Sequence, residues 1–352
     1  MVKNNYFQSR SVLTINRLNN ILDKLPDFVS DYFVGIEENS SPLTRLNYAT
    51  DLLIFFDYVA KRFKTNIKEL EIEVLNEITA MDIERFLSYL SSFNYNGKHH
   101  ICNEKAKARK LASIRSMYKY FFNRDLIVAN VAAKVSTPKL HDKEIIRLEN
   151  EEIGSLINSA ESGKGLSPHQ LAYQKNTSIR DVAILTLFLG TGIRISELVG
   201  VNVDDIFLDN NSFIITRKGG NRTILYFTDE VKEELIKWLD YRRTIKDLKP
   251  EEKALFVSLQ NKRISVRAVE NLVKKYAKIV SPLKKITPHK LRSTFGTKLY
   301  RETGDIYIVA DYLGHKDINT TKRHYAAISD DMRRSAIDKI VLKPDEDNGE
   351  NT

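Results

Sequence analysis

The chain has 352 residues, enough for two domains of ordinary size with a hydrophobic core in each. Hydrophobic residues make up 42% and charged residues 29%, a balance that is typical of a globular protein and excludes a disordered one. The formal net charge of +9 favours a polyanionic partner, with nucleic acid as the leading candidate. On charge alone, the alternative is a basic protein without such a partner.

Cysteine content and apolar runs indicate the compartment. The single cysteine, Cys102, allows no intrachain disulfide and no cysteine metal cluster, which fits a reducing cytosol. Residues 1–10 lack the apolar core of a secretory signal, and the apolar run at 182–190 is too short to cross a membrane. We therefore expect a cytoplasmic protein with no membrane contact.

The N-terminal third has helical patterning. Residues 1–24 are polar and weakly patterned, so we expect an arm or a short helix there. From 25 to 136 the pattern is helical almost throughout. A Ser-Ser-Pro start signal precedes apolar residues at helical spacing up to residue 63, and a further helix is expected from Thr79.

The helix expected over 104–123 has two different faces. One face is an apolar seam, and the opposite face carries Lys105, Arg109 and Lys119 with small residues between them. Small residues would let the helix approach a duplex closely while the cations contact phosphates. The alternative is an ordinary solvated basic face.

A mixed domain is expected after a linker. Charged residues and Pro138 indicate the linker over 137–147. Helices are then predicted over 149–162, 179–190, 229–247 and 265–279, with a short helix in the polar insertion at 163–178. The stretch SFIITRKGGNRTILYF predicts a β-hairpin around two glycines. The tail at 343–352 is predicted to be disordered.

The stretch TPHKLRSTFG, at 287–296, predicts a helix start. Thr287 suits the N-cap and Pro288 the first helical position, so His289 and Arg292 would share one face of the first turn. The unpaired N–H groups and partial positive charge of a helix start suit a phosphate. We predict an anion site with a proton-transfer group beside it; the alternative is a solvated helix end.

Four more stretches carry polar side chains that could join this site. Arg194 follows a Gly-Thr-Gly turn, in the first turn of an expected helix, and Lys218 lies at the tip of the expected hairpin. His315 follows a Leu-Gly pair, and Tyr325 follows a short polar segment. Two arginines, a lysine, two histidines and a tyrosine are thus available.

This ordered set resembles the tyrosine recombinases, also called phage integrases, over nearly the whole chain. TGIRISEL, a hairpin lysine, HKLRSTF, LGH and a terminal HYA occur in the order of the family. Each motif alone is weak, but all five in order are very specific. S-x-x-T-x-x-x-Y-x-x-D-L at 41–52 resembles the helical DNA-clamp domain of the family. The insertion at 161–177, with SIRDVAILTLFLGTGIRISELVG after it, most resembles the Xer recombinases, in particular the single Xer-type enzymes of Firmicutes.

The resemblance implies a mainly α fold. It implies a helical, SAM-like DNA-clamp domain over 25–136 and a mixed α+β catalytic domain, with a small antiparallel sheet, over 148–342. Glu197, one turn after Arg194, would brace a histidine or an arginine. The implied catalytic residues are Arg194, Lys218, His289, Arg292, His315 and the nucleophile Tyr325. The expected DNA contacts are Lys105, Arg109, Lys119 and Arg45.

The implied reaction is phosphoryl transfer on DNA. Tyr325 would attack a backbone phosphate, giving a 3′-phosphotyrosyl bond and a free 5′-hydroxyl that can reverse the step. Because one phosphodiester replaces another, no ATP is needed, and the sequence shows neither a phosphate loop nor acidic residues at metal-ligand spacing. No cofactor or metal is expected. Tyr307 and Tyr312 are rival nucleophiles, although the ring of Tyr312 is expected to pack within its helix.

The other side chains would divide the chemistry between them. Arg194 and Arg292 would present planar forks to the non-bridging oxygens. A phenol with a pKa of about 10 needs a base near neutral pH, and His289 is the candidate. Lys218 would protonate the leaving 5′-oxygen, and His315 would hydrogen-bond the phosphate.

The implied partners are a double-stranded DNA recombination site and further copies of this chain, as a tetramer in the synaptic complex. A helix expected at 329–342 would dock into a neighbouring protomer; packing on its own domain is the alternative. A DNA translocase of the division machinery is expected from the resemblance alone. Alternatives to a chromosomal role are a mobile-element integrase, a non-catalytic DNA-binding protein and a monomeric type IB-like topoisomerase.

Overall fold

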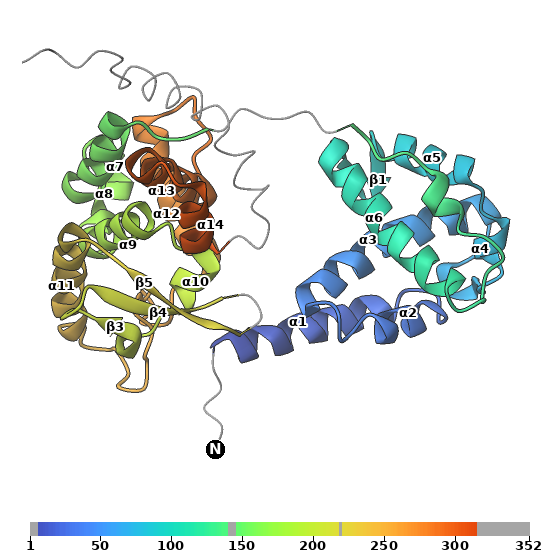
Figure 1. Cartoon of the computed structure of the whole chain (residues 1–352), viewed down its shortest axis with the longest axis horizontal. Coiled ribbons are helices and arrows are strands. Elements are labelled where there is room, and N and C mark those ends of the chain that lie inside the picture. The colour runs from blue at the N-terminus through green and yellow to red at the C-terminus, as the bar shows by residue number, and fades with distance from the viewer. Residues whose placement is uncertain (1–5, 140–145, 218–219, 315–352) are drawn as a thin grey trace, which may run out of the picture. The chain divides into compact units, whose positions relative to one another are not determined.

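The computed structural model describes residues 6–139, 146–217 and 220–314. Two compact units divide the chain, Met1–Lys143 and Glu144–Thr352 (Figure 1). Within the described residues, none of the helices has both the length and the apolar character that a membrane crossing requires.

The N-terminal unit is helical, as the pattern predicted. Its α-helices are α1 (Tyr6–Leu22), α2 (Val29–Gly35), α3 (Pro42–Phe63), α4 (Val74–Glu77), α5 (Ala80–Tyr89) and α6 (Glu104–Phe122). Two 3₁₀ turns, η1 (Ile67–Glu69) and η2 (Val131–Lys134), complete the helical elements. The segment expected as an arm or a short helix is the 17-residue α1, which contacts α3 and buries Leu18 in the core.

Local signals explain where these helices begin. Ser41 caps α3 by accepting a hydrogen bond from the backbone N of Thr44 at 3.2 Å, and Pro42 takes the first helical position. Thr79 caps α5 in the same way. The predicted apolar seam of α6 is fully buried and comprises Leu111, Ile114, Tyr118 and Phe121.

A hairpin in this unit was not predicted. Strands β1 (Phe93–Tyr95) and β2 (Lys98–His100) pair antiparallel around Asn96 and Gly97, which both have positive φ (51° and 70°). An Asn-Gly pair is the preferred two-residue turn for a tight hairpin, so the local signal was present in the sequence.

The C-terminal unit surrounds a buried helix. Helix α9 (Ser178–Thr191) is buried along most of its length and packs against α7 (Asn150–Ser162), α11 (Asp229–Arg243) and α13 (Pro288–Thr303), as Figure 1 shows. The other helices are α8 (Pro168–Gln174), α10 (Ile195–Gly200), α12 (Val266–Val280) and α14 (Ile306–Leu313), with the 3₁₀ turn η3 (Val203–Asp205). Helix α8 is the short helix predicted within the polar insertion.

A small antiparallel sheet includes the predicted hairpin. Its strand order is β3 (Ile206–Phe207), β4 (Ser212–Thr216) and β5 (Arg222–Tyr226). Ser212 pairs with Tyr226 and Thr216 with Arg222, which fixes the register of the two longer strands.

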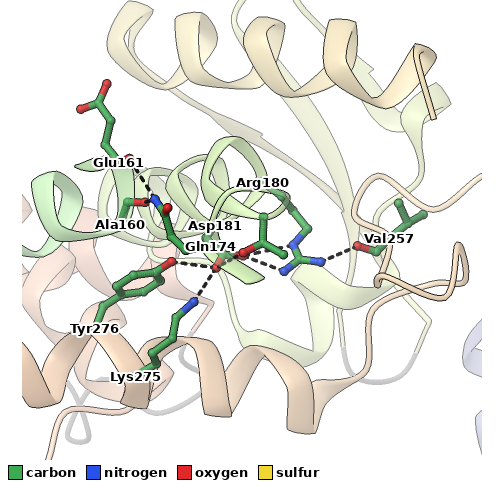
Figure 2. Close-up of polar contacts among 9 residues, drawn as sticks. Ala160, Glu161, Gln174, Arg180, Asp181, Val257, Lys275 and Tyr276 are labelled. Atoms are coloured by element: carbon green, nitrogen blue, oxygen red, sulfur yellow. Dashed lines mark hydrogen bonds and ion pairs between the residues drawn. The ribbon is translucent and has the colours of Figure 1, made fainter. Parts of the chain in front are cut away.

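A buried carboxylate joins α9 to α12 (Figure 2). Asp181 is 1% exposed and accepts hydrogen bonds from Arg180 Nη2 at 2.7 Å and from the Tyr276 hydroxyl at 2.9 Å. Lys275 Nζ lies 3.1 Å from the same carboxylate, and Arg180 also donates to the Val257 carbonyl at 3.0 Å. Asp181 therefore neutralises two cations inside the unit that carries the expected catalytic residues.

Replacing Asp181 by alanine is expected to lower the free energy of unfolding by about 3–5 kcal/mol, because the two partly buried cations lose their counter-charge. Urea unfolding followed by circular dichroism measures the change. Asp240 is the matched control, since its ion pair with Arg243 is exposed on α11, and alanine there should cost less than about 1 kcal/mol. Equal stability of the two variants would contradict the role given to Asp181.

Candidate active site

Arg194 lies where α9 ends and α10 begins. Gly192 ends α9 in the left-handed region, with φ 58°, which glycine adopts without strain. A side chain at this position would also overlap Phe295. The backbone of Arg194 is extended and occupies the N-cap of α10, one position before the first turn in which it was predicted.

Glu197 holds Arg194 in place. Its carboxylate is 3% exposed and accepts hydrogen bonds from the backbone N of Arg194 at 2.9 Å and from Nη1 at 2.8 Å. A charge-assisted pair of this kind fixes the plane of the guanidinium. Of the two partners expected for Glu197, the structure therefore shows an arginine.

Arg292 links the α9–α10 turn to the end of α14. It is 8% exposed, and its guanidinium donates to the backbone carbonyls of Gly192 and Leu313. Arg194 reaches the same helix end, where its Nη2 donates to the Gly314 carbonyl at 2.9 Å. The two arginines, almost 100 residues apart in sequence, thus share one anchoring point.

His289 lies at the start of the same helix as Arg292. Pro288 takes the first helical position, as predicted, and His289 follows it with an exposed side chain. Ser293 Oγ lies 3.5 Å from Nδ1 of the histidine. Thr287 occupies the N-cap position, as predicted, although its side chain makes no capping hydrogen bond.

A third arginine, which was not predicted as a site residue, contacts the end of α14. Arg217 follows β4, and its Nη2 donates to the Tyr312 carbonyl at 3.0 Å. We call the consecutive backbone carbonyls of Tyr312, Leu313 and Gly314 the carbonyl row; each accepts from one arginine. The only signal in the sequence was the position of Arg217 directly before Lys218.

The structure separates the two rival tyrosines. The hydroxyl of Tyr312 donates to the Tyr226 carbonyl at 2.6 Å, and its ring packs against Phe295 at 5.3 Å between centroids. Burial raises the pKa of Tyr312 to about 12, which makes its phenolate harder to form. Tyr307 is 65% exposed on α14 and has no such restraint on its ring. The expected packing of Tyr312 is confirmed, and Tyr307 stays a rival.

Three expected catalytic residues, Lys218, His315 and Tyr325, lie outside the described residues. The helix expected at 329–342 and the tail lie outside them as well. Among the described residues, no group of three or more His, Cys, Asp or Glu side chains is arranged to hold a metal ion.

The cationic face of α6 lies on the surface of the N-terminal unit. Lys105, Arg109 and Lys119 are exposed on the side opposite the buried seam. Arg109 Nη2 pairs with Asp51 of α3 at 2.8 Å, and Lys110 Nζ pairs with the same carboxylate at 2.8 Å. Asp51 is fully buried, and its carboxylate joins α6 to α3. The same carboxylate fixes the orientation of the Arg109 side chain.

Arg45 differs from the expectation. It is 8% exposed, and its guanidinium pairs with Glu37 at 2.6 Å. The pairing with Glu37 offsets the charge of Arg45, so the structure gives no support to a contact with a DNA phosphate, which stays a prediction. The position of Arg45 on α3 does not reveal the pairing in the sequence, because Glu37 lies in a different segment of the chain.

Comparison with known proteins identifies both units. Residues 147–332 match the model described as the phage integrase family, and residues 27–125 match the phage integrase N-terminal SAM-like domain. Tyrosine recombinase XerC of Caldanaerobacter subterraneus subsp. tengcongensis is 32% identical over 331 residues, covering 90% of this chain and 86% of that protein. Tyrosine recombinase XerS of Streptococcus agalactiae is 30% identical over 355 residues, covering 93% and 99%.

Solved structures share the fold. The XerH site-specific recombinase bound to palindromic difH substrate, in a post-cleavage complex, has a TM-score of 0.66 at 20% identity, over 85% of this chain and 80% of that one. The Tn1549 transposon integrase in complex with circular intermediate DNA has a TM-score of 0.63 at 20% identity, over 87% and 97%. The predicted fold class is confirmed. The chain belongs to the phage integrase family of tyrosine recombinases, and its relatives include recombinases of the Xer type.

Proposed function

We propose that this chain is a site-specific DNA recombinase that cuts and rejoins DNA through a 3′-phosphotyrosyl bond to Tyr325. The observation that carries the proposal is the convergence of Arg194 and Arg292 on one helix end, in a chain that matches tyrosine recombinases over most of its length. Guanidiniums held by fixed partners need little reorganisation when charge develops on a phosphate.

Each step of the reaction has a candidate group in this chain. The Tyr325 oxygen forms a bond to phosphorus as the bond from phosphorus to the 5′-oxygen breaks. His289, exposed at the start of α13, would accept the phenolic proton, and Lys218 would give a proton to the departing 5′-oxygen. Arg194, Arg292 and His315 would stabilise the charge on the non-bridging oxygens. The reverse attack by a 5′-hydroxyl closes the strand without ATP.

The substrate is duplex DNA, and the exposed cations of α6 support this assignment. Lys105, Arg109 and Lys119 would contact phosphates in a way that positions the protein without reading sequence. Recombination joins two duplexes that are each cut on both strands, which requires four copies of a chain with one nucleophile. We therefore infer a tetramer in the synaptic complex.

The cellular role that we propose is resolution of chromosome dimers, with a division-associated DNA translocase as partner. Similarity to the XerC and XerS relatives along nearly the full chain supports this role. The alternative is integration or excision of a mobile element, because the Tn1549 integrase has the same fold.

Covalent capture of genomic DNA tests the proposal. The purified chain is incubated with sheared DNA of the source organism in EDTA without nucleotide, washed in denaturant, and the attached fragments are sequenced. We expect covalently bound fragments from a single chromosomal locus. Fragments from the ends of a mobile element would support the alternative role. Absence of any covalent fragment would contradict the recombinase assignment, and site-independent fragments would favour a topoisomerase.

A further inference from the structure

Arg217 is fixed at both its backbone and its side chain. Its backbone N donates to the Asn221 carbonyl at 2.8 Å, and its own carbonyl accepts from the Gly220 N at 3.0 Å, so Arg217 closes the β4–β5 turn. Its guanidinium meanwhile reaches the Tyr312 carbonyl at the end of α14. One residue thus connects the hairpin to a helix that lies about 95 positions later in the chain.

Gly314 gives independent support for this placement. It ends α14 with φ 60°, and a Cβ atom at this position would overlap the guanidinium of Arg217. The arginine therefore lies directly over the backbone of the residue before His315. A glycine is required there both for the positive φ and for the close approach of the side chain.

The carbonyl row explains why three cations gather at this point. The last carbonyls of a helix lack intrahelical donors and carry a partial negative charge. Arg194, Arg217 and Arg292 come from three different elements, and each satisfies one carbonyl of the row. Arg194 and Arg292 have expected roles at the phosphate, whereas Arg217 has none in the reaction described above.

We propose that Arg217 is a positioning residue for DNA cleavage, which ties the described residues that flank Lys218 to the carbonyl row that also anchors Arg194 and Arg292. The proposal rests on the proposed function. Arg217 itself contacts no reacting atom. A displacement of about 1 Å in a catalytic group can cost about 100-fold in rate. Loss of the contact between Arg217 and the Tyr312 carbonyl should therefore slow the proton transfer from Lys218.

The test compares two leaving groups. Covalent adduct formation by Arg217→Gln is measured at saturating DNA, on a normal cognate site and on the same site with sulfur in place of the scissile 5′-oxygen. An alkoxide must receive a proton as it leaves, whereas a thiolate leaves without one. We expect a loss of about 10- to 100-fold on the oxygen substrate. Most of the rate should return on the sulfur substrate, with DNA affinity unchanged.

Arg222→Gln is the matched control. Arg222 lies on the same hairpin, its side chain is 65% exposed, and it pairs with Asp205. This variant loses the same charge but should change the rate less than about threefold on both substrates, as for surface changes in general. Arg217→Lys, which can still donate one hydrogen bond to the Tyr312 carbonyl, should recover part of the rate on the oxygen substrate.

Two results would overturn the proposal. An equal loss on both substrates would show that Arg217 supports the fold or another step, and an undiminished rate on the oxygen substrate would show that the contact has no role in cleavage. Gly314→Ala, which displaces the guanidinium, should reproduce the leaving-group dependence, and the double variant should be no slower than the slower single variant. A wild-type chain that forms no adduct on either substrate would instead refute the recombinase function itself.

Discussion

Replacing Arg292 by alanine is expected to lower the rate of DNA cleavage by about 100- to 1,000-fold, the cost typical of losing one donor to a developing oxyanion. The guanidinium is buried and anchored to the Gly192 and Leu313 carbonyls, which leaves it a fixed orientation for the phosphate. Single-turnover adduct formation on a nicked cognate site measures the effect. DNA affinity should fall much less, because many other phosphate contacts remain.

Controls separate chemistry from folding in this experiment. Arg292→Ala also leaves two buried carbonyls without their donor, at a cost of about 1–3 kcal/mol, so rates are compared well below the melting temperature of the variant. Arg301→Ala removes a cation from the exposed end of the same helix and should leave the rate nearly unchanged. Arg292→Lys keeps the positive charge but loses the planar guanidinium. We expect its cleavage rate to lie between the rates of Arg292→Ala and of the wild-type chain. If Arg292→Ala cleaved DNA at the wild-type rate, Arg292 would have no role in the catalytic site.

Replacing Tyr325 by phenylalanine should abolish the covalent adduct while the cognate site is still bound with wild-type affinity. Phenylalanine retains the ring but has no oxygen to attack phosphorus, so the phosphotyrosyl bond cannot form at this residue. Denaturing gel electrophoresis detects the adduct, and a mobility shift under native conditions detects binding.

The same substitution at a rival position is the control. Tyr307→Phe removes an exposed hydroxyl from α14 and is expected to leave adduct formation unchanged. Tyr312→Phe should keep the adduct and lose about 1 kcal/mol of stability, since it removes the hydrogen bond to the Tyr226 carbonyl. An undiminished adduct from Tyr325→Phe would end its assignment as the nucleophile.

Much of the fold could be predicted because its signals are local. The Ser41–Pro42 start of α3 and the apolar seam of α6 need only a few neighbouring residues, and both are as expected. The β1–β2 hairpin was missed although its Asn-Gly turn was visible, because its three-residue strands are too short to show an alternating pattern. The length of α1 depends on packing against α3, which a weakly amphipathic sequence does not reveal.

The candidate site was predictable only in part. Arg194 and Arg292 stood out through their motifs, and the structure shows both at the end of α14. Arg217 and the carbonyl row were not predicted, because a sequence pattern describes side chains and gives no information on which backbone carbonyls accept hydrogen bonds. The contact with Arg217 also forms only when segments far apart in the sequence pack together. The burial of Arg45 and its pairing with Glu37 were hidden for the same reason, because they depend on packing between segments of the chain.

The most direct test of the central claim is to identify the atom pair that joins the chain to DNA. A trapped adduct is digested with trypsin and nuclease, and the modified peptide is sequenced by mass spectrometry. We expect a nucleotide linked through its 3′-phosphate to Tyr325, within the tryptic peptide 324–333. A linkage through Tyr307 or any other residue, or through a 5′-phosphate, would contradict it.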